Sequence, residues 1–354
     1  AMKKLSANRR RFINNCVTYG MVIVAFIVMQ VLNGAGMLSP SLQGQLVPIC
    51  AYITMAISLN IVVGVSGELS LGHAGFMSVG AFSGIIASLS MQEMIPFAPL
   101  RLAVAMVIGA ACAGVAGVII GVPVLRLRGD YLAIVTLAFG EIIRNIVNIL
   151  YVGIDVNGLH FSIKNEAALN LAEGGMSILK GPMGVTTNVK IATFTAGFIL
   201  VLIAITVALN LINSRSGRAI MALRDNRIAA ESVGINATKY KLMAFVTSAV
   251  LAGAAGALYA MNYVSLAGKK FDFNTSILIL VYVVLGGLGN IRGSIIAAAL
   301  LYILPEMLRS MYEYRMLIYA VVLILIMIAT NNPRMKAIFA RILPHKKEGG
   351  DENG

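Results

Sequence analysis

The feature that most constrains this chain is a series of ten long apolar runs that together cover most of the sequence. About 20 apolar residues are enough for a helix to cross a bilayer, and charged residues make up only 12% of the sequence. The sequence therefore predicts an all-α polytopic membrane protein with about ten transmembrane helices, and it excludes an ordinary soluble enzyme. The runs are 17–38, 46–65, 71–91, 101–124, 130–151, 190–212, 241–263, 274–289, 294–309 and 316–331.

Two glycine-rich links interrupt the series and predict short or broken helices. One link, 286–293, separates two runs that are short for a complete crossing. The other, 64–73, separates the second run from the third. Irregular backbone at membrane depth is tolerated where it is buried in protein or lines a cavity. We therefore expect re-entrant or broken helices at both links.

The distribution of the 28 lysines and arginines predicts the orientation. With ten spans and the N-terminus inside, 19 of them fall on the inner side and nine on the outer side. Cytoplasmic loops collect such cations, so the expected topology is N-in/C-in. The chain then divides into a basic cytoplasmic N-terminus (1–16), a transmembrane domain (17–332) and a cytoplasmic tail (333–354). Within the domain, loop 152–189 is expected outside and loop 213–240 inside. This topology accounts for the net charge of +13 without a nucleic-acid partner.

Motifs for covalent chemistry are missing from the sequence. It contains no G-x-x-x-x-G-K-[ST] phosphate loop, no H-E-x-x-H and no G-x-S-x-G. Cysteines and histidines are scattered without metal-ligand spacing. We expect a chain that is no enzyme and that binds no metal or cofactor itself.

The inner loop contains the pattern of a short capped helix. Asp225 or Asn226 can cap a helix that runs from Arg227 through Val233, and Gly234 provides a C-terminal stop. Charged residues surround the helix at Arg224, Asp225, Arg227 and Glu231.

A small apolar patch on this helix has two interpretations. Ile228, Ala229 and Val233 form the patch, which can sit in a groove of another protein. The alternative is a membrane-surface helix held by acidic lipid. Because Ala229 and Ala230 are small, we expect any partner groove to approach the helix backbone closely there.

Polar residues also occur inside the apolar runs, where they are costly and are candidates for function. Glu141, Arg144, Asn145 and Asn148 form one stripe at helical spacing on the expected outer half of the fifth run. The stripe can line the translocation path, or Glu141 and Arg144 can pair and lock the helix. Glu68 and His73, in the first glycine-rich link, can gate the inner mouth or cap helix ends.

The spacing Ala229-Ala230-x-x-x-Gly234 resembles the cytoplasmic loop of bacterial ATP-binding-cassette importer permeases. In those proteins Glu-Ala-Ala-x-x-x-Gly marks the coupling helix that docks on the ATPase. This chain has Ile228 where the glutamate is usual.

Further segments are similar to the branched-chain amino acid permease family, and to its M-type subunit in particular. The resemblance runs from about residue 48 to about residue 333, and urea and short-chain amide permeases look similar. The matching segments are 66–76, 125–137, 217–219, 224–226, 234–236 and 284–289.

The resemblance implies a subunit of an assembly in the bacterial plasma (inner) membrane. It implies a second permease subunit in a heterodimer, two ATP-binding subunits that hold ATP and Mg, and an extracytoplasmic substrate-binding protein. The implied substrates are leucine, isoleucine and valine; alternatives are a urea or short-chain amide permease and an ion-coupled secondary transporter. The implied ATPase-coupling residues are Arg224, Asp225, Asn226, Ala229, Ala230, Glu231 and Gly234.

Overall fold

The computed structural model describes residues 7–125, 130–155, 158–172, 174–187, 190–308 and 314–331. Expectations for residues 1–6, for 126–129 and for the tail 333–354 lie outside the described residues. The chain divides into two compact units, Ala1–Tyr302 and Ile303–Gly354, and each is described by itself.

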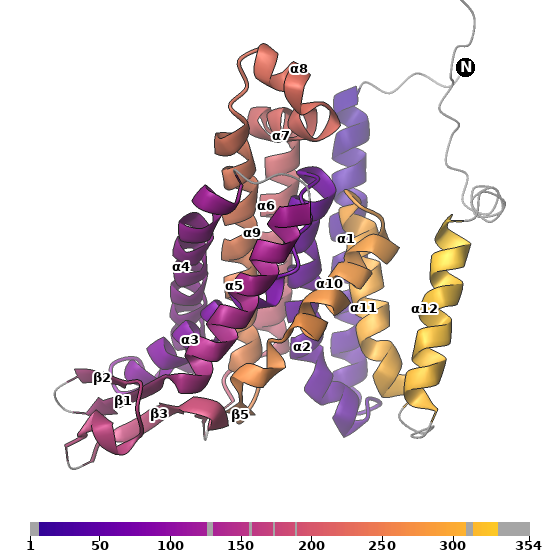
Figure 1. The fold of residues 1–354 in the computed structure, drawn as a ribbon. Coiled ribbons are helices and arrows are strands. Elements are labelled where there is room, and N and C mark those ends of the chain that lie inside the picture. Colours follow the sequence, from indigo (N-terminus) through magenta and orange to yellow (C-terminus); the bar gives the residue numbers. More distant parts are fainter. Residues whose placement is uncertain are drawn as a thin grey trace, which may run out of the picture. The chain divides into compact units, whose positions relative to one another are not determined.

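Each of the ten predicted apolar runs coincides with a helix (Figure 1). In the described part of the chain, seven of these helices are long and apolar enough to cross a membrane. The other three, α10, α11 and α12, have 14, 17 and 17 residues. The prediction of a mostly helical polytopic protein is thus confirmed. The number of about ten membrane spans stays a prediction. The helices are α1 (Ala7–Gly34), α2 (Pro40–Asn60), α3 (His73–Ser90), α4 (Ala98–Val124), α5 (Asp130–Ile149), α6 (Phe194–Asn213), α9 (Ala237–Ala260), α10 (Phe273–Gly286), α11 (Ile291–Met307) and α12 (Arg315–Asn331).

Helix α9 lies at the centre of the first unit and packs against α2, α3 and α4. Small residues make these contacts possible, since glycine and alanine allow membrane helices to approach closely. A Cβ atom on Gly80 of α3 would overlap the backbone of Gly253 on α9. Ala252, Ala255 and Ala257 are completely buried.

The outward faces of several helices are apolar. Val24 on α1, Val107 on α4 and Ile134 on α5 are 60%, 68% and 61% exposed. Soluble proteins rarely expose apolar surface on this scale, so these faces fit contact with lipid chains.

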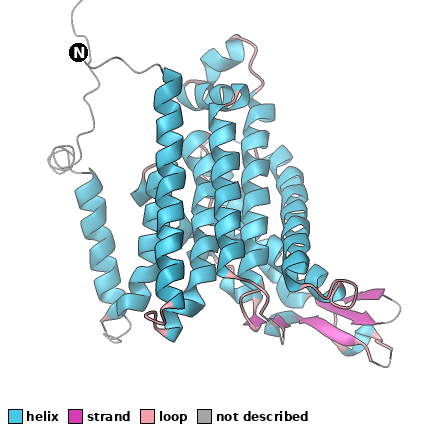
Figure 2. Ribbon diagram, turned by 180° about the vertical axis from the view of Figure 1, so that it is seen from behind, coloured by secondary structure: helices cyan, strands magenta, loops and turns pink. Residues whose placement is uncertain are grey.

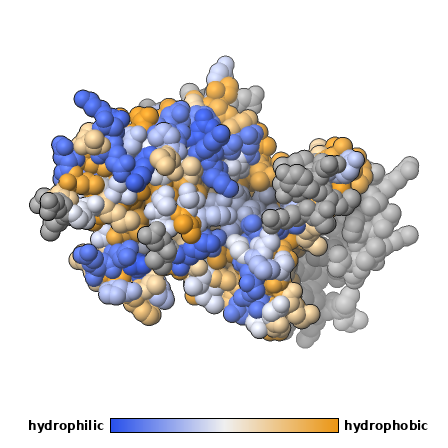
Figure 3. Space-filling model, turned by 90° about the horizontal axis from the view of Figure 1, so that it is seen from below, coloured by the Kyte–Doolittle hydropathy of each residue, from blue (hydrophilic) through white to orange (hydrophobic). Residues whose placement is uncertain are grey.

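One end of the first unit carries two short helices, α7 (Arg215–Asp225) and α8 (Arg227–Ser232), which connect α6 to α9. The opposite end carries strands (Figure 2). This strand-bearing end shows much hydrophilic surface, with hydrophobic residues between (Figure 3).

The strands correct the prediction of an all-α fold. They form a five-stranded antiparallel sheet in the order β2-β1-β3-β4-β5, mostly within loop 152–189. Val152 of β1 pairs with Phe161 of β2, and Val185 of β4 pairs with Leu266 of β5. A turn at 181–184 joins β3 to β4 and has positive φ at Gly181 and Gly184. The strands are β1 (Tyr151–Asp155), β2 (Gly158–Ser162), β3 (Met176–Lys180), β4 (Val185–Thr186) and β5 (Ser265–Leu266).

The second unit contains the last residues of α11 and, in its described part, helix α12. Leu317, Ile324 and Met327 of α12 are each more than half exposed. The helix therefore presents apolar side chains outward, as a lipid-facing segment does.

Candidate functional site

The connection between α6 and α9 is a series of helices, each capped by a polar side chain. The Ser214 hydroxyl accepts a hydrogen bond from the amide of Gly217 (2.9 Å) at the start of α7. Asn226 ends α7 and begins α8, and its Oδ1 accepts from the Ala229 amide (3.1 Å). Asn236 caps α9 in the same way. Such caps hold the helix ends in place, so α8 has a defined position on the bundle.

The short helix predicted in this loop is confirmed. Of the two candidate caps, Asn226 caps α8, whereas Asp225 accepts hydrogen bonds from the Arg224 guanidinium (3.0 Å). Gly234 follows α8 with φ +87°, a conformation that glycine adopts at little cost. The predicted C-terminal stop is therefore correct.

Ala230 faces inward, contrary to the expectation that a partner groove approaches the helix there. Its side chain is 5% exposed and packs against Leu223 of α7 and Ala237 of α9. Ala229, one position earlier, is exposed. Ala230 therefore holds α8 against its neighbours, because its inward side chain fills the space between three helices.

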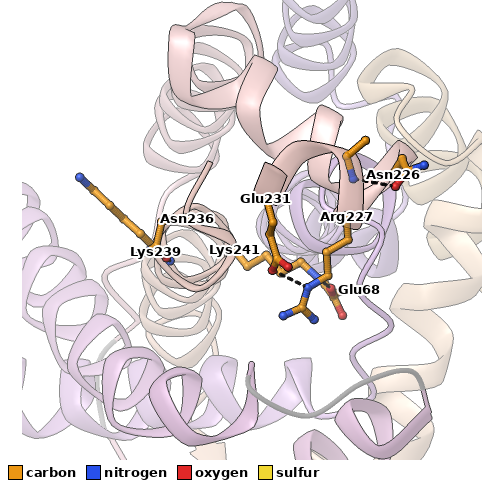
Figure 4. A network of polar contacts seen from close by, with 8 residues as sticks. Glu68, Asn226, Arg227, Glu231, Asn236, Lys239 and Lys241 are labelled. Carbon is orange, nitrogen blue, oxygen red and sulfur yellow. Dashed lines mark hydrogen bonds and ion pairs between the residues drawn. The ribbon is translucent and has the colours of Figure 1, made fainter. Parts of the chain in front are cut away.

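The outward side of α8 and of the turn that follows it carries large exposed apolar side chains. Ile228 is 82% exposed and Val233 is 76% exposed. Beside them, Arg227 Nε donates to Glu231 Oε1 at 2.9 Å (Figure 4). An apolar pair next to a fixed charge pair is a typical surface for docking another protein.

Glu68 and His73 do not cap helices, and the capping interpretation is wrong for both. Glu68 forms an ion pair with Lys241 of α9, whereas Lys239 points away from it (Figure 4). His73 is 2% exposed, with its Nε2 atom 2.7 Å from the Ser58 hydroxyl. A role in gating stays a prediction.

The backbone amide at the start of α3 is instead hydrogen-bonded to a hydroxyl group from a helix that is distant in sequence. The Ala74 amide donates to the hydroxyl of Ser276 on α10 (3.1 Å). The hydroxyl of Thr136 on α5 accepts from the Leu71 amide, just before α3 (3.1 Å). Contacts between helices that are distant in sequence therefore fix the end of the first glycine-rich link.

The polar stripe of α5 lies beside the beginning of α10. Arg144 Nη2 is 2.7 Å from Glu141 Oε2, and each side chain is 31% exposed. A small cavity of about 10 Å³, lined by Glu141, Asp272 and Ser276 among others, opens next to the stripe and has room for about one water molecule. Asn145 is exposed and Asn148 is half-buried.

Two polar residues near these sites were missed from the sequence. Asp272 caps α10 and accepts from the Thr275 amide (2.9 Å); the Asp-x-x-Thr spacing before an apolar run was an available signal. Asn60 is 1% exposed and accepts from the Gly289 amide (2.7 Å). It thereby joins the two glycine-rich links, and its signal was an amide side chain within the apolar run 46–65.

The chain matches one family model over residues 41–329, described as the branched-chain amino acid transport system / permease component. The chain belongs to this family. Permeases of this family are transport components and not enzymes. The chain is a multi-pass protein of the inner membrane.

Relatives include the high-affinity branched-chain amino acid transport system permease proteins LivM of Salmonella typhimurium and Escherichia coli, 38% and 36% identical over 290 residues. Those alignments cover 78% of this chain and 66% of each relative, so the chain spans about two thirds of their length. The ribose import permease protein RbsC of Escherichia coli is 28% identical over 78% of this chain and 81% of its own length. No solved structure matches the chain.

Proposed function

We propose that this chain is the membrane-spanning subunit of an ATP-driven, binding-protein-dependent importer of leucine, isoleucine and valine. The observation that carries the proposal is the rigidly capped helix α8, which presents Ile228 and Val233 outside the bundle of a family permease. Membership of the family does not by itself define the substrate, because a ribose permease is also a relative. The proposed substrates therefore rest on the more similar branched-chain amino acid permeases.

The α7–α8 loop is proposed as the contact with one of the two ATP-binding subunits, which hold ATP and Mg. Ile228, Ala229 and Val233 provide the apolar contact, and the Arg227–Glu231 pair borders it. Asn226 and Gly234 define where α8 begins and ends. ATP-driven closure of the partner subunits moves α8, and the helices of the bundle respond by changing access to the path.

A cytoplasmic position for this loop, as the cation distribution predicts, determines where the other proposed subunits bind. With 213–240 inside, the sheet end faces outward, where a substrate-binding protein delivers the amino acid. The hydrophilic surface of that end fits a position in water outside the lipid core (Figure 3), and the cation distribution supports the outer side for it. A second permease subunit completes a heterodimer, and the stripe with Glu141, Arg144, Asn145 and Asn148 lines the path that a zwitterion follows.

The test is ATP-dependent leucine uptake by the chain reconstituted in liposomes with the ATP-binding and binding proteins of its own genome. Ile228→Asp should remove both uptake and ATPase association, because burying an isoleucine side chain contributes about 1.5–3 kcal/mol. Met94→Asp, at an apolar residue that is 81% exposed in the α3–α4 link, is the matched control and should transport normally. Normal uptake by Ile228→Asp contradicts the docking role.

A further inference from the structure

Helix α2 ends inside the bundle in an unusual turn. The π-helical segment η1 (Ile61–Val65) follows α2, and the Ser66 amide donates to the Ile61 carbonyl (3.0 Å). Single π-turns within helices occur frequently at functional sites. The last carbonyls of a helix lack partners within that helix, and the Gly64 carbonyl belongs to this final turn.

Arg224, in the last turn of α7, donates to that carbonyl. Its Nη1 atom lies 2.8 Å from the Gly64 oxygen. A cation at a helix C-terminus interacts favourably with the helix dipole. The Arg224 stem lies over Gly67, where a Cβ atom would be 2.5 Å from Arg224 Cγ. Asp225 Oδ1 accepts from the Nε and Nη2 atoms (3.1 and 3.0 Å) and so fixes the plane of the guanidinium.

Asn60 extends this connection to the second glycine-rich link. Its Oδ1 accepts from the Gly289 amide (2.7 Å), and its Nδ2 donates to the Ser294 hydroxyl (2.8 Å). A side chain at Gly64 would overlap both Asn60 Oδ1 and the Gly289 amide nitrogen. The absence of a Cβ atom at Gly64 therefore lets the end of α2 meet the turn between α10 and α11.

We propose that Arg224 is the positioning residue that transmits the movement of α8 to an inner gate. The gate consists of one segment from each glycine-rich link, 66–72 (link 66–72) and 287–290. The inference rests on the proposed function, since it assigns the route from the coupling helix to the path. Asn226 alone separates α7 from α8, so a displacement of α8 reaches Arg224 within two residues. The Gly64 carbonyl and, through Asn60, the Gly289 amide then move with it.

A second contact holds the same region from the other side. Lys241 on the central helix α9 pairs with Glu68 in link 66–72. Link 66–72 therefore contacts α9 through Glu68, and Arg224 of α7 contacts Gly67 in this link and the adjoining Gly64. A shift of α7 relative to α9 changes the geometry of the link, as a gate controlled from the loop requires.

The first experiment measures leucine uptake and ATP hydrolysis by the reconstituted complex. Arg224→Ala should keep ATPase association and hydrolysis while uptake per ATP falls about tenfold to a hundredfold, the range expected for a lost hydrogen bond from a charged group. Arg224→Lys should restore part of the uptake, because an ammonium group can also donate to Gly64. The control is Arg218→Ala on the same helix, whose guanidinium bonds the Asn213 carbonyl (3.3 Å); it should behave as wild type.

The second experiment measures amide hydrogen exchange of the purified chain without partners. Arg224→Ala should speed exchange in 61–72 and in 287–290, and Arg218→Ala should not. Unchanged exchange overturns the proposal, as does loss of ATPase association together with uptake, which would make Arg224 a docking residue. If the wild-type complex fails to import leucine but Arg224→Ala still speeds exchange in both segments, the proposed function is wrong. The connection from Arg224 to the two links is then still supported.

Discussion

Lys241 in the first turns of α9 forms an ion pair with Glu68 in the link after α2, and the two side chains are 11% and 14% exposed. Removing one partner leaves the other charge poorly solvated. Lys241→Met and Glu68→Gln should therefore each destabilise the chain more than the double variant does. Thermal unfolding in detergent should give a coupling energy of about 1–3 kcal/mol. Additive effects of the two single changes would contradict the pair.

The helices were predictable because the apolar length of a membrane helix is a local property of the sequence. The cap of α8 was equally local, since Asn226 binds an amide three residues away. The strands were missed because they have two to five residues each, too few for an alternating pattern to be recognised. Strand β5 also comes from a distant part of the chain.

The contacts of Glu68 and Arg224 could not be predicted for a similar reason. Glu68 pairs with a residue 173 positions away, and Arg224 with one 160 positions away, and the sequence contains no signal for such contacts. Ala230 was assigned to the wrong side because a helix of six residues has fewer than two turns. Its inward face becomes evident only when α7 and α9 are in place.

The inward position of Ala230 predicts a clear contrast with its neighbour. Ala230→Leu should overpack the contact with Leu223 and Ala237 and cost about 1–3 kcal/mol. Ala229→Leu, on the exposed side, should leave stability within about 0.5 kcal/mol and lower ATPase association. Thermal unfolding and co-purification with the ATP-binding subunits measure the two effects. Equal destabilisation by both changes would contradict the orientation of α8.

The Glu141–Arg144 pair should contribute little to stability because both side chains are 31% exposed. Partly exposed pairs contribute up to about 1 kcal/mol. We expect the double variant Glu141→Gln, Arg144→Gln to insert and fold normally while leucine uptake falls. If each single variant is instead much less stable than the double variant, the pair locks the helix and does not line the path.

Glu166, outside the helical bundle, gives a pH-dependent prediction. The Lys180 ammonium, 3.0 Å from Glu166 Oε1, lowers the pKa of this carboxyl group. A pKa that is lower in the folded state stabilises that state above the unfolded pKa, and this contribution is lost as the pH falls through the folded pKa. The difference in melting temperature between wild type and Glu166→Gln should therefore shrink and then disappear as the pH falls below the ordinary glutamate pKa of about 4.3.

The control removes the partner of Glu166 by the change Lys180→Gln. In a Lys180→Gln background, Glu166→Gln should no longer produce this pH-dependent difference. A difference that grows towards acid pH would have the wrong sign for a lowered pKa and would contradict the role of Lys180.

The orientation of the chain is tested by labelling single cysteines in intact cells. Cys16, Cys50 and Cys112 are first replaced, so that each probe is the one reactive thiol. The probes are Asn165→Cys, between β2 and β3, and Ser232→Cys, at the end of α8; both positions are exposed. The two positions lie at opposite ends of the bundle. The comparison is therefore decisive, because no rearrangement within one loop could move a probe to the other side of the membrane.

A membrane-impermeant maleimide should modify the cysteine at 165 and spare the one at 232, because the cation distribution predicts that loop 213–240 is inside. After the membrane is permeabilised, the cysteine at 232 should react as fast as the one at 165, which shows that protection came from the membrane and not from burial. The reverse pattern in intact cells would place α8 outside, where ATP-binding subunits cannot reach it. The docking role of Ile228 and the gate control by Arg224 would then both be wrong, since each requires α8 to meet a partner in the cytoplasm.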